Sequence, residues 1–118
     1  MNNYKELKIW QKSVDLAVKV YELTQDFPKE EIYGLTSQIR RSGVSIPSNI
    51  AEGSGRNSSK EFNHFLGISH GSSYELDTQL TIASRIGFLK EEHFQTLQSE
   101  IDEIQKMNHG LKKSLKLP

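Results

Sequence analysis

Apolar side chains recur at three- and four-residue steps through almost the whole chain, and this period most narrows the possible folds. The pattern fills four segments, at about 5–25, 28–53, 58–87 and 90–115, and it is the period of an amphipathic α-helix. No window alternates apolar and polar residues for long enough to predict a strand. The breaks between the segments are short and leave little room for a crossover connection. The sequence therefore predicts one all-α domain, residues 1–118, folded as a left-handed, up-down-up-down antiparallel four-helix bundle.

Turn and capping residues mark the ends of the predicted helices. Pro28 is placed to be the first residue of the second helix, where its missing N–H costs nothing. The glycine-containing stretch 53–57 predicts the turn that follows this helix. Ser58 with Glu61 three residues later matches a capping box at the start of the third helix, and Gly87 suits the C-terminal end of that helix.

Pro47 lies inside the second predicted helix. It lacks a backbone donor, and its ring crowds the carbonyl of Gly43. Because the apolar stripe keeps its phase from Ile39 to Ile50, we expect a kink at Pro47 rather than a break. A helix that restarts at Ser45 is the alternative.

Composition removes several classes of protein from consideration. The 118 residues include no cysteine, which excludes disulfides, thiolate zinc sites and cysteine nucleophiles. No run of about 18 apolar residues is present, so we expect no transmembrane helix. Residues 1–8 are polar and charged, unlike a signal peptide. We therefore expect a cytoplasmic protein without a membrane partner.

One pattern resembles a catalytic motif, yet it does not predict an enzyme. Residues 67–71 match the G-x-S-x-G nucleophile pattern, but that motif requires a strand-to-helix turn, and Ser69 falls in the middle of a predicted helix. We interpret Ser69 as a small residue at a close crossing with Gly43 of the second helix. The four histidines include no pair at the spacing of a helical metal site. We expect no catalytic residue, cofactor or metal.

The first predicted helix carries two apolar stripes rather than one. The stripe that we assign to the bundle core contains Leu7, Trp10, Val14, Ala17, Val18 and Tyr21. A second stripe, on a different side of the helix, contains Ile9, Leu16, Val20 and Leu23. An amphipathic helix in a monomeric bundle needs only one apolar side. We therefore expect the second stripe to contact another subunit; an unusually wide core is the alternative.

The second predicted helix has an outer line of residues opposite its core stripe, consisting of Arg41, Ser45, Ser48 and Glu52. Serines on two successive turns are weak helix formers for a solvated face. This choice favours a contact surface, and a plain solvated face is the alternative. The predicted oligomer interface combines this line with the second stripe of the first helix and comprises Ile9, Leu16, Val20, Arg41, Ser45, Asn49, Glu52 and Glu75.

Charge is distributed unevenly, although fifteen basic residues balance fifteen acidic ones. In an up-down bundle the start of the first helix, the 53–58 turn and the end of the fourth helix share one end. We predict that the cations of this end bind nucleic acid through its phosphates. The alternative is that the fourth helix only complements its own dipole. The predicted nucleic-acid-binding residues are Lys5, Lys8, Lys12, Arg56, Lys60, Lys106, Lys112, Lys113 and Lys116.

Several ordered blocks of sequence carry a family resemblance. They are LKIWQ at 7–11, FPKEE and YGLTSQIRR within 27–41, SIPSNIAEG at 45–53, and GSSYEL followed by TQL within 71–80. With these blocks the chain resembles the four-helix-bundle proteins encoded by intervening sequences within bacterial 23S rRNA genes. The accessory variability determinants of diversity-generating retroelements are relatives of that family. Two departures, Asp77 in place of the usual glutamate and Gly43 in place of a common alanine, leave the expected fold unchanged.

This resemblance implies a homo-oligomeric ring, typically a pentamer, of up-down four-helix bundles without enzymatic activity. For the retroelement relatives it implies binding to nucleic acid and to a reverse transcriptase. The leading hypothesis is therefore a non-enzymatic oligomeric protein that binds RNA or DNA. The alternative is a structural or protein-interaction scaffold, for example an accessory subunit of a reverse transcriptase.

Overall fold

The computed structural model describes residues 3–116, and its regular structure is helical. No strand occurs between these residues, and the all-α prediction with four long helices is confirmed. Two short 3-10 helices (η) accompany the long ones. The elements are η1 (Tyr4–Glu6), α1 (Lys8–Thr24), η2 (Lys29–Glu31), α2 (Leu35–Ser54), α3 (Ser59–Arg85) and α4 (Glu91–Ser114).

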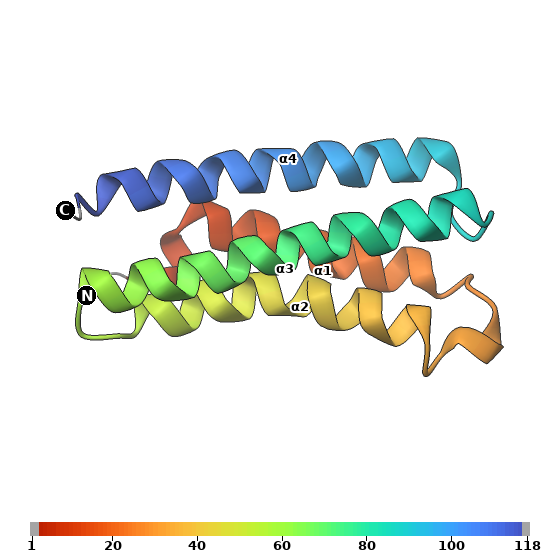
Figure 1. The fold of residues 1–118 in the computed structure, drawn as a ribbon, viewed down its shortest axis with the longest axis horizontal. Helices are drawn as coiled ribbons and strands as arrows, with labels where there is room; N and C mark the ends of the chain where they lie inside the picture. The colour runs from red at the N-terminus through yellow and green to blue at the C-terminus, as the bar shows by residue number, and fades with distance from the viewer. Residues whose placement is uncertain (1–2, 117–118) are drawn as a thin grey trace.

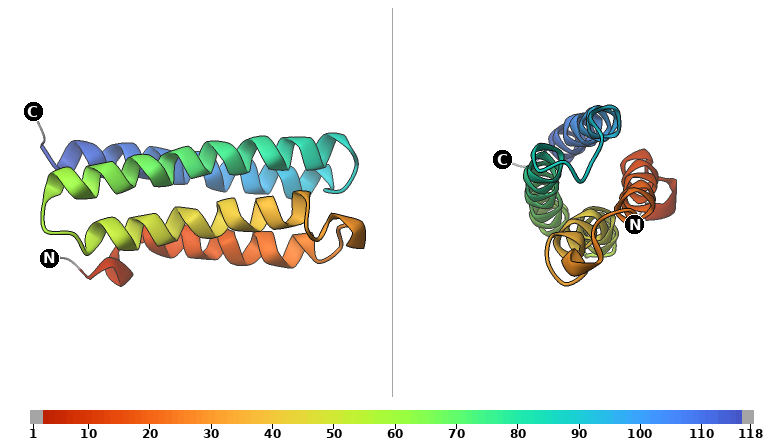
Figure 2. Two further views of the ribbon diagram at one scale, coloured as in Figure 1. Left: turned by 60° about the horizontal axis from the view of Figure 1, so that its bottom comes forward. Right: turned by 90° about the vertical axis from the view of Figure 1, so that its right-hand side faces the viewer.

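The four long helices form an elongated bundle with extents of 45 × 23 × 22 Å. Each long helix packs against the next one in the chain, α4 also packs against α1, and α2 with α3 form the most extensive pair. Figure 1 places the α2–α3 connection at the same end as η1 and the last turn of α4, with the other two connections at the opposite end. The end-on view in Figure 2 shows the helices arranged around a common centre. The left-handed sense of the bundle stays a prediction.

The predicted ends of α3 are confirmed by its caps. The Ser58 hydroxyl accepts a hydrogen bond from the N–H of Glu61 at 3.2 Å, and the Glu61 carboxylate accepts one from the N–H of Asn57 at 3.2 Å. Together they close the α2–α3 turn in the manner of a capping box. At the other end Gly87 has a φ of +86°, which glycine adopts without a steric penalty.

The first two long helices begin later than predicted, each after a short 3-10 helix. α2 begins at Leu35 rather than at Pro28, which instead precedes η2. Ile32 is 46% exposed and Tyr33 is 95% exposed, so the segment before Leu35 does not continue the core stripe of α2. The Glu31 carboxylate accepts a hydrogen bond from the N–H of Leu35 at 3.1 Å and so stabilises the new helix start.

α2 continues through Pro47. The helix runs without interruption from Leu35 to Ser54 with Pro47 buried inside it, so the alternative of a helix restarting at Ser45 is wrong. The kink expected at Pro47 stays a prediction.

The core face of α1 includes the stripe that we assigned to another subunit, together with Ala17 of the stripe that we assigned to the core. Leu7 and Trp10 also pack against the core, so the alternative of a wider core describes α1 better. Ile9, Leu16 and Val20 are 3%, 1% and 1% exposed, and they pack within the common hydrophobic core. Their assignment to an oligomer interface is therefore wrong, because a side chain buried inside its own chain cannot contact a second one. Val18 and Tyr21, which we assigned to the core, are 51% and 44% exposed.

Small hydroxyl side chains explain the wrong choice of face. Ser13 and Thr24 are buried, and their hydroxyls donate to carbonyls of their own helix, at Trp10 (3.0 Å) and Val20 (2.7 Å). A hydroxyl satisfied within its own helix can be buried without an unpaired donor. The buried face of α1 is therefore a mixed stripe of Ile9, Ser13, Leu16, Ala17, Val20 and Thr24.

Polar side chains join α2 to α3. Ser69, in the middle of α3, is 1% exposed and belongs to this group, so its interpretation as a small packing residue is confirmed. We call the following three contacts the α2–α3 seam: the Ser42 hydroxyl donates to Gln79 Oε1 at 2.9 Å, the hydroxyls of Ser45 and Ser72 lie 2.8 Å apart, and the Ser69 hydroxyl donates to the carbonyl of Ile46 at 3.0 Å.

Gly43 lies against α1 rather than against α3. A Cβ placed at Gly43 would lie 3.8 Å from both Ala17 Cα and Val20 Cγ1. The predicted close crossing with α3 at this position is therefore wrong, because the small-residue face of α2 is divided between two neighbouring helices. α2 approaches α3 closely at Gly53, where a Cβ would lie 2.6 Å from Phe65 Cβ.

Replacement of Gly43 by leucine is expected to destabilise the fold by about 1–3 kcal/mol, because the longer side chain overpacks the α1–α2 contact. Gly43→Ala is the matched control. Its Cβ meets its neighbours at ordinary van der Waals distances, and alanine gains about 1 kcal/mol of helix propensity over glycine. Thermal unfolding followed by circular dichroism should place the midpoint of Gly43→Leu below the wild type and that of Gly43→Ala above it. A wild-type midpoint for Gly43→Leu would contradict the burial of this position.

Candidate nucleic-acid interface

The structure gathers the nine predicted cations toward one end of the bundle. This end carries η1, the start of α1, the α2–α3 turn and the end of α4, as Figures 1 and 2 show. Lys5 lies in η1, Arg56 in the turn and Lys112 in the last turn of α4. Lys12 and Lys106 lie farther along α1 and α4, toward the middle of the molecule.

Three of the nine cations form ion pairs within residues 3–116. Asp102 and Glu103 lie among these cations, so the net positive charge of this end is smaller than the nine cations alone suggest. Such exposed pairs contribute little to stability, but they leave less free charge for a polyanion. The pairs are Lys12 with Glu103 at 2.6 Å, Lys106 with Asp102 at 3.2 Å, and Arg56 with Glu52 at 3.2 Å.

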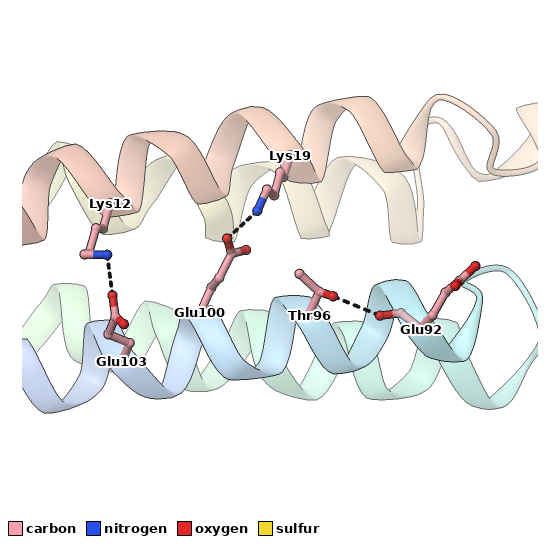
Figure 3. A network of polar contacts seen from close by, with 6 residues as sticks. All are labelled: Lys12, Lys19, Glu92, Thr96, Glu100 and Glu103. Carbon is pink, nitrogen blue, oxygen red and sulfur yellow. Dashed lines mark hydrogen bonds and ion pairs between the residues drawn. The ribbon is translucent and has the colours of Figure 1, made fainter.

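Lys12 has its partner on a neighbouring helix. Figure 3 shows Lys12 reaching from α1 to Glu103 of α4, and Lys19, farther along α1, reaching Glu100. The hydrogen bond and the charge of Glu103 raise the pKa of Lys12 above its usual value of 10.5, so the ammonium stays charged. We call these two ion pairs the α1–α4 bridge. They join α1 to α4, whose contact is less extensive than the other contacts between neighbouring long helices.

Arg56 is also held in place. Its guanidinium lies over the ring of Phe65, 4.8 Å from the ring centroid, while it pairs with Glu52. The remaining six cations make no ion pair with any residue that the structure describes. They are Lys5, Lys8, Lys60, Lys112, Lys113 and Lys116, and we call them the lysine cluster.

Lys112 lies against α3 and is not confined to the end of the bundle. Its Nζ is 3.6 Å from the position that a Cβ would take at Gly67, so this glycine leaves room for the lysine. His70 lies one turn farther along α3, and its pKa is lowered from 6.5 by burial and by the charges of Lys112 and His109. Our sequence reasoning missed this group because it compared histidines within one helix, whereas His70 and His109 lie on different helices. The signal in the sequence that could have indicated this group is Gly67, one helical turn before His70.

The other residues predicted for an oligomer interface fall into two groups. Ser45 and Asn49 are half-buried; Ser45 belongs to the α2–α3 seam, and the Asn49 amide donates to the Ser45 carbonyl at 2.8 Å. Both therefore support the internal packing of the bundle. Arg41, Glu52 and Glu75 are exposed, and their contact with a second chain stays a prediction.

Val14, Val18 and Tyr21 of α1 line a surface groove against α2. The groove has a volume of about 370 Å³. Beside it the Arg40 guanidinium lies 4.6 Å from the centroid of the Tyr21 ring and donates to Thr24 Oγ1 at 2.9 Å. Exposed apolar patches on soluble domains often mark contacts with other proteins. This α1–α2 groove is lined by Val14, Ala17, Val18, Tyr21, Glu22, Gln25, Val44 and Pro47.

The G-x-S-x-G stretch at 67–71 lies within α3. Ser69 donates its hydroxyl to the carbonyl of Ile46, whereas a catalytic serine of this motif is exposed on a sharp turn. Within the described range no three His, Cys, Asp or Glu side chains form a group that could hold a metal ion. None of the described helices is both long enough and apolar enough to span a membrane.

By its fold and by this surface, the chain is a small all-α protein whose four long helices carry lysines toward one end of the bundle. The model of the 23S rRNA-intervening sequence protein family matches residues 5–110. This chain therefore belongs to that family. Its relation to the accessory variability determinants stays a prediction.

A solved structure has the same fold. It is the crystal structure of a protein with unknown function from the S23 ribosomal protein family of Bacteroides thetaiotaomicron, which shares 25% sequence identity with this chain at a TM-score of 0.80. The similarity covers 89% of this chain and 98% of that chain. No curated protein matches.

Proposed function

We propose that this protein is a non-enzymatic, oligomeric protein that binds RNA or DNA through backbone phosphates. The observation that carries the proposal is the lysine cluster, six cations without an ion-pair partner among residues 3–116. Lysine binds phosphate as a point charge and reads no base sequence. Weak sequence specificity and a steep dependence on salt follow from this chemistry.

Self-association would strengthen such binding, because a ring of copies places several lysine clusters near one another and adds their fields. The α1–α2 groove supports this part of the proposal, since Val18 and Val44 are 51% and 41% exposed there and covering them is favourable. The family resemblance implies a pentamer. Light scattering should give a mass several times the 13.5 kDa of one chain. A measured mass of one chain would reject self-association.

Salt-dependent binding tests the proposed function. Labelled structured RNA and duplex DNA are titrated with the protein at about 50 and about 200 mM salt. Changing Lys112, Lys113 and Lys116 together to glutamate should weaken binding to both by at least about tenfold and flatten the salt dependence, because three phosphate contacts become repulsive.

The matched control places the same change of charge at the opposite end of the bundle. Lys29, Arg85 and Lys90 are exposed there, in η2, in the last turn of α3 and before α4. Their combined change to glutamate should leave binding close to the wild type. The proposal is rejected if the wild type does not bind at about 50 mM salt, or if both triple variants lose affinity equally.

A protein-interaction scaffold, such as an accessory subunit of a reverse transcriptase, is the second candidate. The α1–α2 groove favours it, because an apolar surface groove suits a protein better than a polyanion. A high ratio of nucleic-acid to protein absorbance in the purified protein would favour the first candidate. Protein free of nucleic acid that forms a stable complex with a protein partner would favour the scaffold.

A further inference from the structure

Next to the lysine cluster, basic side chains of α3 and α4 approach one another. Lys112 extends from α4 across Gly67 of α3. His70 is half-buried one turn farther along α3, close enough to Lys112 and His109 for both charges to act on it. We call His70, His109 and Lys112 the α3–α4 cluster.

Two hydrogen bonds fix α4 against α3 beside this cluster. The Gln105 side chain donates to the Ser73 hydroxyl at 3.0 Å, and the buried Asn108 amide donates to the carbonyl of Leu66 at 2.9 Å. The backbones that carry the cluster are therefore held in register. Lys112 of α4 therefore stays beside the α3 turn that carries Gly67 and His70, and its positive charge favours an anion there.

All the charges that act on His70 have the same sign. Burial and the approach of Lys112 and His109 from α4 all disfavour the charged imidazole, and no carboxylate and no group of α2 contributes. From α3 itself the Tyr74 ring contacts the imidazole edge-on, with 4.9 Å between centroids.

Two aspartates that lie seven residues from the histidines of this cluster, about two helical turns away, have partners of their own. Asp102 of α4 pairs with Lys106 at 3.2 Å, and Asp77 of α3 accepts a hydrogen bond from the Gln98 side chain at 2.8 Å. Within the ring of His70, Nδ1 is buried and has no hydrogen-bond partner in the described chain. Nε2 is thus the nitrogen that can meet a ligand from the surface.

We propose that the α3–α4 cluster binds a backbone phosphate of the nucleic acid and takes up a proton when it does so. The inference rests on the proposed function and adds a specific site to it. A phosphate beside Lys112 and His70 is attracted by the ammonium and accepts a hydrogen bond from it. The proton taken up from solvent enters at Nε2 of His70, and the resulting Nε2–H donates to the phosphate. Gly67 keeps that approach free of a side chain.

Proton uptake follows from the sign of the charges. Burial, Lys112 and His109 lower the pKa of His70 in the free protein, and a bound anion favours the charged imidazole and so raises that pKa. The complex then holds the proton more tightly than the free protein does. By linkage the affinity increases as the pH falls from above the pKa in the complex toward the pKa in the free protein.

An NMR titration of the full chain tests the proton uptake directly. In the free protein the His70 imidazole should titrate below 6.5. Adding a hairpin RNA or a duplex DNA should raise this midpoint, and Lys112→Gln should raise it in the free protein by removing a repelling charge.

Affinity measurements at about pH 5.5 and about pH 7.5 form the second test. Wild-type binding should tighten about three- to tenfold on acidification, since each unit of pKa shift corresponds to a factor of ten. His70→Gln should lose most of this gain, and Lys112→Gln should bind more weakly at both pH values. His93→Gln and Lys90→Gln, the same changes at the opposite end of the bundle, should behave as the wild type.

The two nucleic acids distinguish the sources of the phosphate. Equal responses of RNA and DNA support a site for their shared phosphodiester backbone, and a response to one alone identifies that one. This inference is overturned if nucleic acid does not raise the titration midpoint of His70 and wild-type affinity does not increase at the lower pH. The proposed function still stands in that case if the Lys112, Lys113 and Lys116 variant loses binding. Absence of wild-type binding at about 50 mM salt overturns both.

Discussion

Leu16→Glu is expected to unfold the protein or to lower its free energy of unfolding by at least about 4 kcal/mol. Leu16 is 1% exposed in the core, and loss of a buried leucine alone costs about 2–5 kcal/mol. A glutamate there must lose its hydration or take up a proton, and either adds to the cost. A domain of this size is stable by about 5–15 kcal/mol. Urea unfolding followed by far-UV circular dichroism measures the change.

Val18→Glu is the matched control, two residues along the same helix. Val18 is 51% exposed within its own chain, so in the dissociated monomer, at low protein concentration, this variant should change the free energy of unfolding by less than about 0.5 kcal/mol. The pair of variants separates the two apolar stripes of α1. A stable Leu16→Glu together with an unfolded Val18→Glu would contradict the assignment of the core face.

Gly53→Ala is expected to destabilise the fold by about 1–3 kcal/mol, because the new Cβ overpacks the contact of α2 with α3. It would lie 2.6 Å from Phe65 Cβ, 3.0 Å from Phe62 Cδ1 and 3.3 Å from the Phe62 carbonyl oxygen. Relief requires movement of the α3 backbone, since Phe65 Cβ is attached directly to it. This cost opposes and exceeds the helix propensity of about 1 kcal/mol that alanine gains over glycine.

Gly71→Ala is the control for the propensity gain. A Cβ at Gly71 would meet no neighbouring atom of the described residues within 4 Å, so this variant should raise the free energy of unfolding by up to about 1 kcal/mol. Chemical denaturation of both variants should therefore give shifts of opposite sign. If both variants were stabilised, α3 would have to move away from position 53 of α2 without a measurable loss of stability, which contradicts the expected overpacking.

The sequence predicts much of this fold because its strongest signals are local. The 3.6-residue period identifies four helices, and Ser58 and Gly87 mark the ends of α3 through interactions within a few residues. The stripes of α3 and α4 face the core as expected, with Leu76 and Leu97 fully buried. Each of these features depends on residues that are neighbours in the chain.

The face of α1 could not be predicted from apolar residues alone. Its exposed stripe has Val18 and Tyr21, and its buried stripe includes Ser13 and Thr24. The two hydroxyls are satisfied inside the helix, so they cost little when buried, and hydropathy does not register that. Which stripe is covered depends on where α2 and α4 lie around α1, a property of tertiary packing.

The candidate site was partly predictable for the same reason. Chain order and helix length place the lysines at one end of the bundle. The partners of Lys12 and Lys112 depend on how each helix is rotated toward its neighbour, because Glu103 and Gly67 lie across a helix contact. The sequence therefore predicted an approximate location for the charge, and the helix rotations decide which cations remain free.

The α2–α3 seam has a consequence for how the molecule can change. Its three hydrogen bonds point in fixed directions between partners on two helices, and a slide of one helical turn, about 5.4 Å, would break all of them at once. A purely apolar contact would tolerate such a slide far better. The hydrogen bonds of the seam therefore fix one alignment of α2 against α3. Residues on the outer faces of these two helices can then differ to suit different partners without a change in how the helices pack.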